Sequence, residues 1–424
     1  MKHALFVAFH YPPEASSSGV LRTLKYTRYL AEHDWRVTVI APSENAYAVT
    51  DKKLSEQIPA TVRVIRTRFI NTKRHLSIRG VYPSLLAVPD TWIGWMPWAV
   101  AAGRDLFRSD PFDLIYSTSP HATAHLIARK LAASSRRPWV ADFRDPWYED
   151  QPAPREPEGW LYRRANKMLE HRVIRDADRV VASTTQLRDV LQTRYPEKQQ
   201  DTIRAILNGY DEADFASLPV VAQRSRERLV MLHAGGITPD FRDPRPLFVA
   251  LRKAADAGAV DLAAIRVKFI GPGKYADAEE VRSSLKRLGL EQTVEFSPRV
   301  SYQESLMELA SADLLLLLQA SPDTASLVPA KLYEYLRTFR PVLALVCPGA
   351  TADVLETTGG GWAVSPEDGA KLQGAIQDIY ALWLSGKLND VRAEHAVLQQ
   401  YDRRILTAGL AKIFNEITQA VQHD

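Results

Sequence analysis

Two successive series of apolar strands alternating with helices constrain this chain more than any other feature. The first series begins with the buried-strand pattern at 4–9 and continues through 35–40 to 179–183. The second runs from 229–234 to 342–346. Because strands joined by crossover helices pair in parallel, each series predicts a doubly wound α/β sheet. The chain is therefore expected to form two Rossmann-like domains of the α/β class.

The length of 424 residues agrees with two domains, since a single hydrophobic core rarely extends beyond about 300 residues. The first series gives way to the second near Asn208. We therefore expect an N-terminal domain at 1–205, a C-terminal domain at 206–400 and a final helix within 401–424. Ligands of such sheets bind beyond the carboxyl ends of the strands, so a cleft faced by both domains is the expected site.

Composition narrows the compartment and the partners. Cys347 is the only cysteine, which excludes an internal disulfide, and no run of 18 apolar residues predicts a membrane-spanning helix. No secretion signal precedes the first strand, so a cytoplasmic location is expected. The net charge of +4 divides into +9 for 1–205 and −5 for the remainder. The basic first part suits an anionic membrane surface, an anionic substrate or simply a solvated face.

The first series carries two groups of candidate residues. Gly19 ends a Pro- and Ser-rich loop before a helix, where free backbone amides favour an anion. Asp142, Arg144 and Asp145 follow the strand at 139–143 and could bind sugar hydroxyls or orient a guanidinium toward phosphate. A structural ion pair is the alternative for these three. His121 opens the next helix, as a catalytic residue or as a neighbour of the helix cap.

In the second series, the strongest signal is the segment 329–336, PAKLYEYL. It predicts a helix with proline in its first turn, and Lys331 and Glu334 lie three residues apart on one face. A lysine near phosphates and a glutamate accepting ribose hydroxyls would explain this pair; a surface salt bridge is the alternative. Asp176 and Asp178 precede a strand, so they indicate a helix-ending turn, and no cluster with metal-ligand spacing is found.

Three ordered segments give the chain a resemblance to glycosyltransferase family 4 and its relatives. The first is FHYPPEASSSGVLR at 9–22, followed by LAEHDWRVTVI at 30–40. The second is ADRVVAS at 177–183, followed by LNGYD at 207–211. The third is PAKLYEYLRTFRPVL at 329–343. Each is loose alone, but the ordered set covers nearly the whole chain.

The resemblance implies a GT-B fold whose last helix crosses back to the first domain. It implies transfer of a sugar, with retention, from a UDP- or GDP-type donor to a glycan, a lipid-linked sugar or a small molecule. No cofactor, metal or nucleic acid is expected. A role in cell-surface glycan biosynthesis is expected. Carried over by position, Glu334 would hold the ribose, Lys331 would lie near the donor, and Gly19 would lie beside the diphosphate.

The sequence also departs from the family pattern. Ser326 stands eight positions before Glu334, where the family often has a glutamate. Gly235 and Gly236 replace a phosphate-binding arginine, so Arg242 and Arg245 are expected to take that role. The usual histidine positions fall on Thr118 and Arg144.

Two alternative functions stay open. A sugar-nucleotide epimerase would use Asp142, Asp145 and His121 as acid and base. A non-catalytic nucleotide-sugar binding subunit would fit the departures at Ser326 and Gly236.

The segment 81–98 is apolar, contains three tryptophans and follows basic residues. It predicts peripheral contact with an anionic membrane. A packed core and an acceptor-binding wall are the alternatives.

Overall fold

The computed structural model describes residues 1–16, 19–79, 81–147, 159–216, 218, 227–240, 242–320 and 324–420. The chain divides into two compact units. The first comprises Met1–Asn208 together with Arg403–Asp424, and the second comprises Gly209–Asp402. Residues 17 and 18 of the loop before Gly19 lie outside the described residues.

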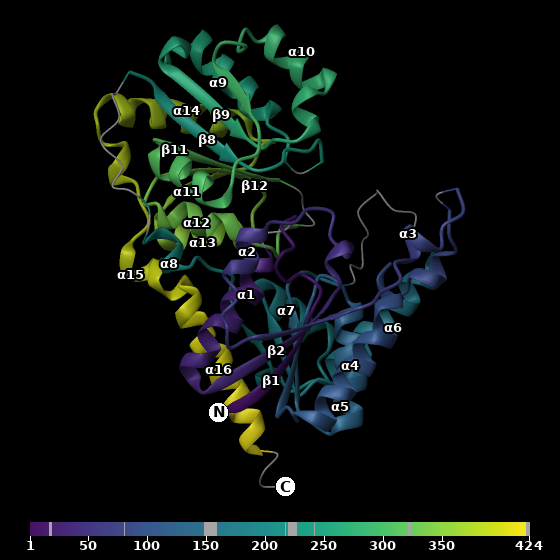
Figure 1. Cartoon of the computed structure of the whole chain (residues 1–424). Coiled ribbons are helices and arrows are strands. Elements are labelled where there is room, and N and C mark those ends of the chain that lie inside the picture. Colours follow the sequence, from purple (N-terminus) through teal and green to yellow (C-terminus); the bar gives the residue numbers. More distant parts are fainter. Residues whose placement is uncertain are drawn as a thin grey trace. The chain divides into compact units, whose positions relative to one another are not determined.

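The first unit is built on a parallel sheet in the order β3-β2-β1-β4-β5-β6-β7 (Figure 1). Every neighbouring pair in it is parallel, as the alternation predicts. From β1 to β3 the strands are added on one side of β1, and from β4 onward they are added on its other side. The carboxyl ends of β1 and β4 therefore form the switch point of the sheet. The strands are β1 Lys2–Ala8, β2 Trp35–Pro42, β3 Arg63–Thr67, β4 Leu114–Thr118, β5 Trp139–Phe143, β6 Arg179–Ala182 and β7 Ile203–Ala205.

Helices cover the sheet of the first unit on both faces. The last helix of the chain, α16, belongs to this unit, as the fold class predicts, and packs against α1 (Figure 1). Phe414 on α16 lies 5.3 Å from Trp35 and 6.3 Å from Phe6 between ring centroids. The helices are α1 Gly19–Tyr29, α2 Lys52–Glu56, α3 Thr72–His75, α4 Met96–Ser109, α5 Thr123–Ser135, α6 Trp160–Asp176, α7 Thr185–Arg194 and α16 Arg403–Ala420.

The second unit repeats this plan with the order β10-β9-β8-β11-β12-β13, again parallel between neighbours. Its switch point lies between β8 and β11. The strands are β8 Leu229–Ala234, β9 Ile265–Ile270, β10 Val294–Ser297, β11 Leu314–Gln319, β12 Val342–Val346 and β13 Gly361–Val364. The helices are α8 Glu212–Phe215, α9 Arg245–Asp256, α10 Glu279–Arg287, α11 Tyr302–Ser311, α12 Ala330–Arg337, α13 Ala350–Thr358, α14 Gly369–Leu384 and α15 His395–Leu398.

The central strands explain the apolar runs seen in the sequence. All residues of β4, β5, β11 and β12 are buried. Parallel sheets covered on both faces bury both sides of a strand, so their sequences are apolar without alternation. Asp142 on β5 is the one carboxylate among these four strands, and its pairing is described below.

Candidate functional site

Lys331 occupies the switch point of the second unit. It lies in the first turn of α12, and its ammonium donates to the carbonyl oxygen of Ala234, at the end of β8, over 2.7 Å. Gly235 follows with φ of +123°, and a Cβ there would collide with the ammonium. Burial, reinforced by the charge of Arg242, lowers the pKa of Lys331 to about 8. The ammonium is thus held where a helix N-terminus and a bare backbone meet, which favours an anion.

Glu334 lies on the same helix face and is 8% exposed. Its carboxylate accepts a hydrogen bond of 3.0 Å from the hydroxyl of Tyr302, at the start of α11. The same hydroxyl lies 3.3 Å from a carboxylate oxygen of Asp214. The sequence placed Lys331 and Glu334 on one face of a helix, and the structure agrees, but the two do not form an ion pair. The surface salt bridge is therefore excluded.

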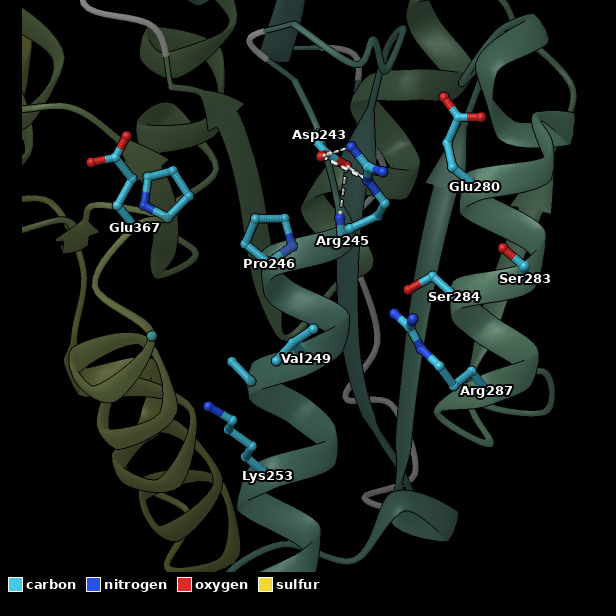
Figure 2. Close-up of a pocket in the computed structure, with 13 residues that line it drawn as sticks. Asp243, Arg245, Pro246, Val249, Lys253, Glu280, Ser283, Ser284, Arg287 and Glu367 are labelled. Atoms are coloured by element: carbon cyan, nitrogen blue, oxygen red, sulfur yellow. Dashed lines mark hydrogen bonds and ion pairs between the residues drawn. The ribbon is translucent and has the colours of Figure 1, made fainter.

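The two arginines expected near the phosphates have different surroundings. Arg242 is partly buried, and its pKa is lowered by burial. Arg245 opens α9, where its guanidinium is held by the carboxylate of its neighbour Asp243 at 2.7–2.9 Å (Figure 2). Arg245 lines a hollow of about 520 Å³ between α9, α10 and the start of α14. Because Arg245 already pairs with a carboxylate, Arg242 is the better candidate for binding a phosphate. Gly236 lies beside the carbonyl oxygen of Pro272.

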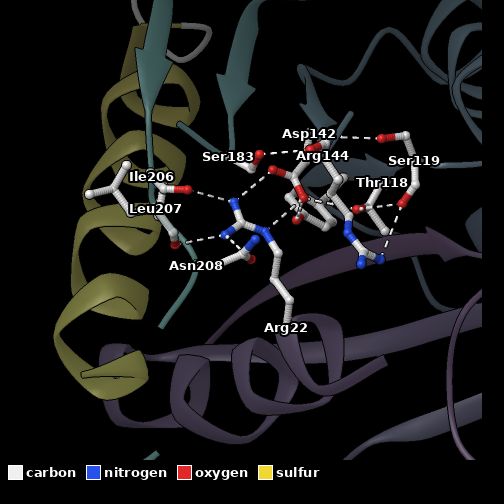
Figure 3. A network of polar contacts seen from close by, with 10 residues as sticks. Arg22, Thr118, Ser119, Asp142, Arg144, Ser183, Ile206, Leu207 and Asn208 are labelled. Carbon is white, nitrogen blue, oxygen red and sulfur yellow. Dashed lines mark hydrogen bonds and ion pairs between the residues drawn. The ribbon is translucent and has the colours of Figure 1, made fainter. Parts of the chain in front are cut away.

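Asp142 in the first unit is fully enclosed (Figure 3). Arg22 donates to both carboxylate oxygens, at 2.9 and 3.1 Å. Tyr116 and Thr118 donate to one of them at 2.6 and 2.8 Å. Burial opposes ionisation, but Arg22 and these hydroxyls hold the pKa of Asp142 below its usual range. The structural ion-pair alternative thus describes the surroundings of this buried carboxylate. A catalytic role for Asp142 stays a prediction.

Arg22 extends this network to the end of the first unit. Its remaining N–H groups donate to the carbonyl oxygens of Ile206 and Leu207, both at 2.8 Å, and to the side chain of Asn208 at 3.3 Å. One guanidinium thus ties α1, β5 and the last residues before the second unit together. Arg22 lies near the start of α1, so the pair joins this end of the helix to β5.

Arg144 faces that N-terminus from the end of β5. Its guanidinium lies so close to Gly19 that a Cβ there would collide with it. Its backbone amide donates to the hydroxyl of Ser119 at 2.8 Å, and its carbonyl accepts from Ser183 at 2.7 Å. Burial lowers the pKa of Arg144, and the charge of partly buried Asp145 opposes this shift. Gly19 and Arg144, predicted separately, are thus brought together in an arrangement that suits an anion.

A histidine–glutamate pair that we did not predict lies after β1. His10 Nδ1 is 2.9 Å from a carboxylate oxygen of Glu14, and both residues are buried. The ring of His121 stacks on that of His10, with centroids 5.3 Å apart. Burial and the neighbouring His10 lower the pKa of His121 to about 3, so its imidazole is neutral. The signal available in the sequence was a histidine and a glutamate four residues apart in the loop that also contains Gly19.

Two of the three tryptophans expected at a membrane pack into the first unit. Trp95 is fully buried and donates from Nε1 to the hydroxyl of Thr67 at 2.7 Å. Trp92 packs on Phe9 with ring centroids 4.4 Å apart, and Trp98 is partly buried. The packed-core alternative therefore describes Trp95 and Trp92. Membrane contact through the segment stays a prediction.

Within the described ranges, no group of three or more His, Cys, Asp or Glu residues is arranged to hold a metal ion. In the same part of the chain, no helix combines the length and the apolar character needed to cross a bilayer.

Comparison with known proteins identifies the first unit. Residues 19–209 match the family model described as "Glycosyl transferase 4-like domain". The chain carries a glycosyl transferase 4-like domain. The predicted glycosyltransferase class is thereby confirmed, and the matched range contains Gly19, His121 and Arg144. A sequence comparison with curated proteins gives no match.

Solved structures extend the match over both units. HepE from Anabaena, in complex with UDP, is 18% identical, with a TM-score of 0.64 over 98% of this chain and 100% of that one. Sucrose-phosphate synthase from Thermosynechococcus elongatus is 14% identical, with a TM-score of 0.66 over 99% and 100%. A glycosyltransferase from Rickettsia africae is 14% identical, with a TM-score of 0.68 over 98% of each chain. At these identities the matches show the fold, which is GT-B as predicted.

Proposed function

We propose that this glycosyltransferase moves a sugar from a nucleoside-diphosphate donor to an acceptor hydroxyl with retention of configuration. The observation that carries the proposal is the switch point of the second unit. There a half-buried ammonium, Lys331, lies beside bare backbone at Gly235 and one helical turn from the buried carboxylate of Glu334. A diphosphate needs the cation, and a ribose needs an acceptor for its hydroxyls.

UDP is the nucleotide we favour, because the similar HepE structure is a complex with UDP. Further HepE structures contain UDP with glucose, and UDP-glucose. In this chain Glu334 would accept the ribose hydroxyls in place of Tyr302, while Lys331 and Arg242 would contact the diphosphate. In the first unit, Gly19 and Arg144 provide a second group of anion-favouring contacts.

The proposed chemistry needs few protein groups. The bond between the anomeric carbon and the diphosphate oxygen breaks, and a bond from the acceptor oxygen forms on the same face. The acceptor proton passes to the departing phosphate. Lys331, Arg242 and the start of α12 stabilise the charge that develops on the leaving group. No protein base is required, which agrees with an Asp142 that is buried and paired with Arg22 and a His121 that is a poor base.

The acceptor would be a glycan or a glycoconjugate precursor of the cell surface, bound by the first unit. The group of His10, Glu14 and His121 supplies polar atoms at the end of β1 that could orient hydroxyls. Contact with an anionic membrane is part of the same proposal, through side chains that differ from the tryptophans first expected.

The test is a donor screen with product analysis. The protein is incubated with UDP- and GDP-sugars and a mixture of lipid-linked and soluble glycan acceptors, and release of nucleoside diphosphate is followed together with the anomeric NMR signals of the product. We expect a transfer product that retains the donor configuration. A 2-epimeric nucleotide sugar formed without acceptor would show an epimerase instead. Saturable donor binding without turnover for any acceptor would indicate the binding-subunit alternative.

A further inference from the structure

Large apolar side chains that stand in solvent gather on two segments of the first unit. The first segment is 70–86, in which Ile78 and Val81 are 79% and 74% exposed, and Leu85 and Leu86 are 57% and 50% exposed. The second is the start of α6, where Trp160 is 64% exposed. Exposed apolar side chains are common singly, but a group of this size indicates a contact surface.

The two segments are neighbours in the fold. The start of α6 packs near the short turn of helix at Ser84–Ala87, and the hydroxyl of Tyr162 donates to the carbonyl of Pro89 at 2.8 Å. Figure 1 shows α3 and α6 on the same side of the first unit. We call their exposed residues, 73–76, 78, 79, 81, 83–86, 160, 161, 164, 167 and 168, the α3–α6 face.

Hydrogen bonds at its base hold this face in shape. Thr72 donates from its amide to the carbonyl of Thr91 and from its hydroxyl to that of Leu86, both at 2.8 Å. At the tip, Ile78 and Val81 exchange two backbone hydrogen bonds, of 2.9 and 3.0 Å. The tip thus presents two apolar side chains whose own backbone amides are paired. Such a segment can leave bulk water without exposing unsatisfied amides to a low dielectric.

The charge of the face has a single sign. Lys73, Arg74, Arg79, Arg164 and Lys167 are exposed. The sequence contains no aspartate or glutamate from 57 to 89 or from 159 to 169. A protein partner of ordinary composition would present both acidic and basic side chains to this surface. An anionic lipid layer instead presents a layer of phosphates over an apolar interior. Apolar side chains interleaved with cations match that order.

We propose that the α3–α6 face docks the protein on an anionic lipid surface, with Ile78 and Val81 entering the headgroup boundary and the surrounding cations contacting lipid phosphates. This surface consists of residues other than Trp92, Trp95 and Trp98. The proposal does not depend on the donor chemistry. If the proposed transfer is also correct, docking brings the first unit to acceptors carried by lipids.

Vesicle co-sedimentation of the full chain tests the proposal. We expect the protein to pellet with vesicles of phosphatidylcholine and phosphatidylglycerol at low salt. It should remain in the supernatant with pure phosphatidylcholine, and release should follow when salt rises to about 0.5 M, since surface charges are then screened. The double variant Ile78→Asp/Val81→Asp should lower the partition coefficient at least about tenfold, because two apolar side chains no longer leave water.

Matched variants control for general effects of charge. Ile405→Asp changes an exposed isoleucine on α16 of the same unit and should leave partitioning unchanged. Arg79→Glu should weaken binding at least about fivefold, whereas Lys412→Glu, an exposed lysine on α16, should weaken it much less. Thermal unfolding and UDP affinity should match the wild type for all four proteins, so a failure of docking is distinguishable from a failure of donor binding.

Three outcomes would overturn the proposal. One is wild-type protein that stays in the supernatant with anionic vesicles at low salt. Another is pelleting that the Ile78→Asp/Val81→Asp variant retains in full. The third is a wild-type dimer in solution that this variant converts to monomer without any lipid binding, which would make the face an interface between two copies of the chain.

Discussion

The ammonium of Lys331 lies 2.7 Å from the carbonyl oxygen of Ala234, across the switch point of the second sheet. This contact joins the first turn of α12 to the end of β8 and leaves the cation beside Gly235. A neutral carbonyl binds an ammonium less strongly than a phosphate does, so replacing this contact by a diphosphate would be favourable. The first predictions concern this cation and the carboxylate one turn further along α12.

Glu334→Ala should weaken binding of UDP by about 1.5–3 kcal/mol, the range for hydrogen bonds to a charged group. Glu308→Ala is the matched control, since Glu308 lies on α11 and pairs with Lys268 at 3.1 Å. Calorimetry measures both variants. An unchanged UDP affinity in correctly folded Glu334→Ala would exclude the ribose role.

Affinity for UDP should fall between pH 7 and pH 9, relative to affinity for uridine. Burial lowers the pKa of Lys331 to about 8, so the ammonium that attracts the diphosphate is lost as pH rises through that value. Bound diphosphate favours the charged form and will move the midpoint upward. Calorimetry at pH 7, 8 and 9 measures the effect. The Lys331→Met variant should lack this pH dependence; retention of the full slope in that variant would assign the titration to another group.

Arg242→Ala should narrow the gap between UDP and uridine affinities more than Arg245→Ala does. Arg245 is already held by the carboxylate of Asp243, and releasing it for a ligand costs that ion pair. Parallel titrations of the two variants with both ligands give the comparison. If only Arg245→Ala narrows the gap, the assignment must be exchanged; if neither does, both arginines are excluded.

Arg22→Ala should destabilise the first unit by about 3–5 kcal/mol, the cost of leaving a buried charge without its partner. Arg36→Ala removes a half-exposed pair with Asp110 and should cost about 0–1 kcal/mol. Denaturant unfolding compares the two. Because the pKa of Asp142 is lowered, its contribution is present above the unfolded carboxyl pKa and disappears as pH falls through the folded one. Acid should therefore reduce the difference between wild type and Arg22→Ala.

The sequence predicted the two sheets because their strands are apolar throughout and their helices have a regular period. It also placed Lys331 and Glu334 correctly on one helix face, since three-residue spacing alone fixes that relation. Local spacing carries no information on partners distant in the chain. Arg22 and Asp142 are 120 residues apart, and so are invisible as a pair until β1, β4 and β5 are assembled.

The same limit explains the other differences. His10 and Glu14 lie in a proline-rich loop with no helical or strand period, so their approach to His121 depends on tertiary packing. The tryptophans at 92, 95 and 98 have an apolar character that suits a core and a membrane equally well. Exposure separates these uses, and among the exposed apolar side chains of the first unit are the tip residues Ile78 and Val81.

The most direct test of the account is a calorimetric titration of the protein with UDP-glucose, compared with UDP and with uridine. The account predicts one saturable site per chain and a higher affinity for UDP than for uridine. The Lys331→Met variant should lose this difference in affinity. Absence of heat for UDP-sugars and GDP-sugars alike, from protein that unfolds cooperatively, would contradict a nucleotide-sugar donor at the switch point of the second unit.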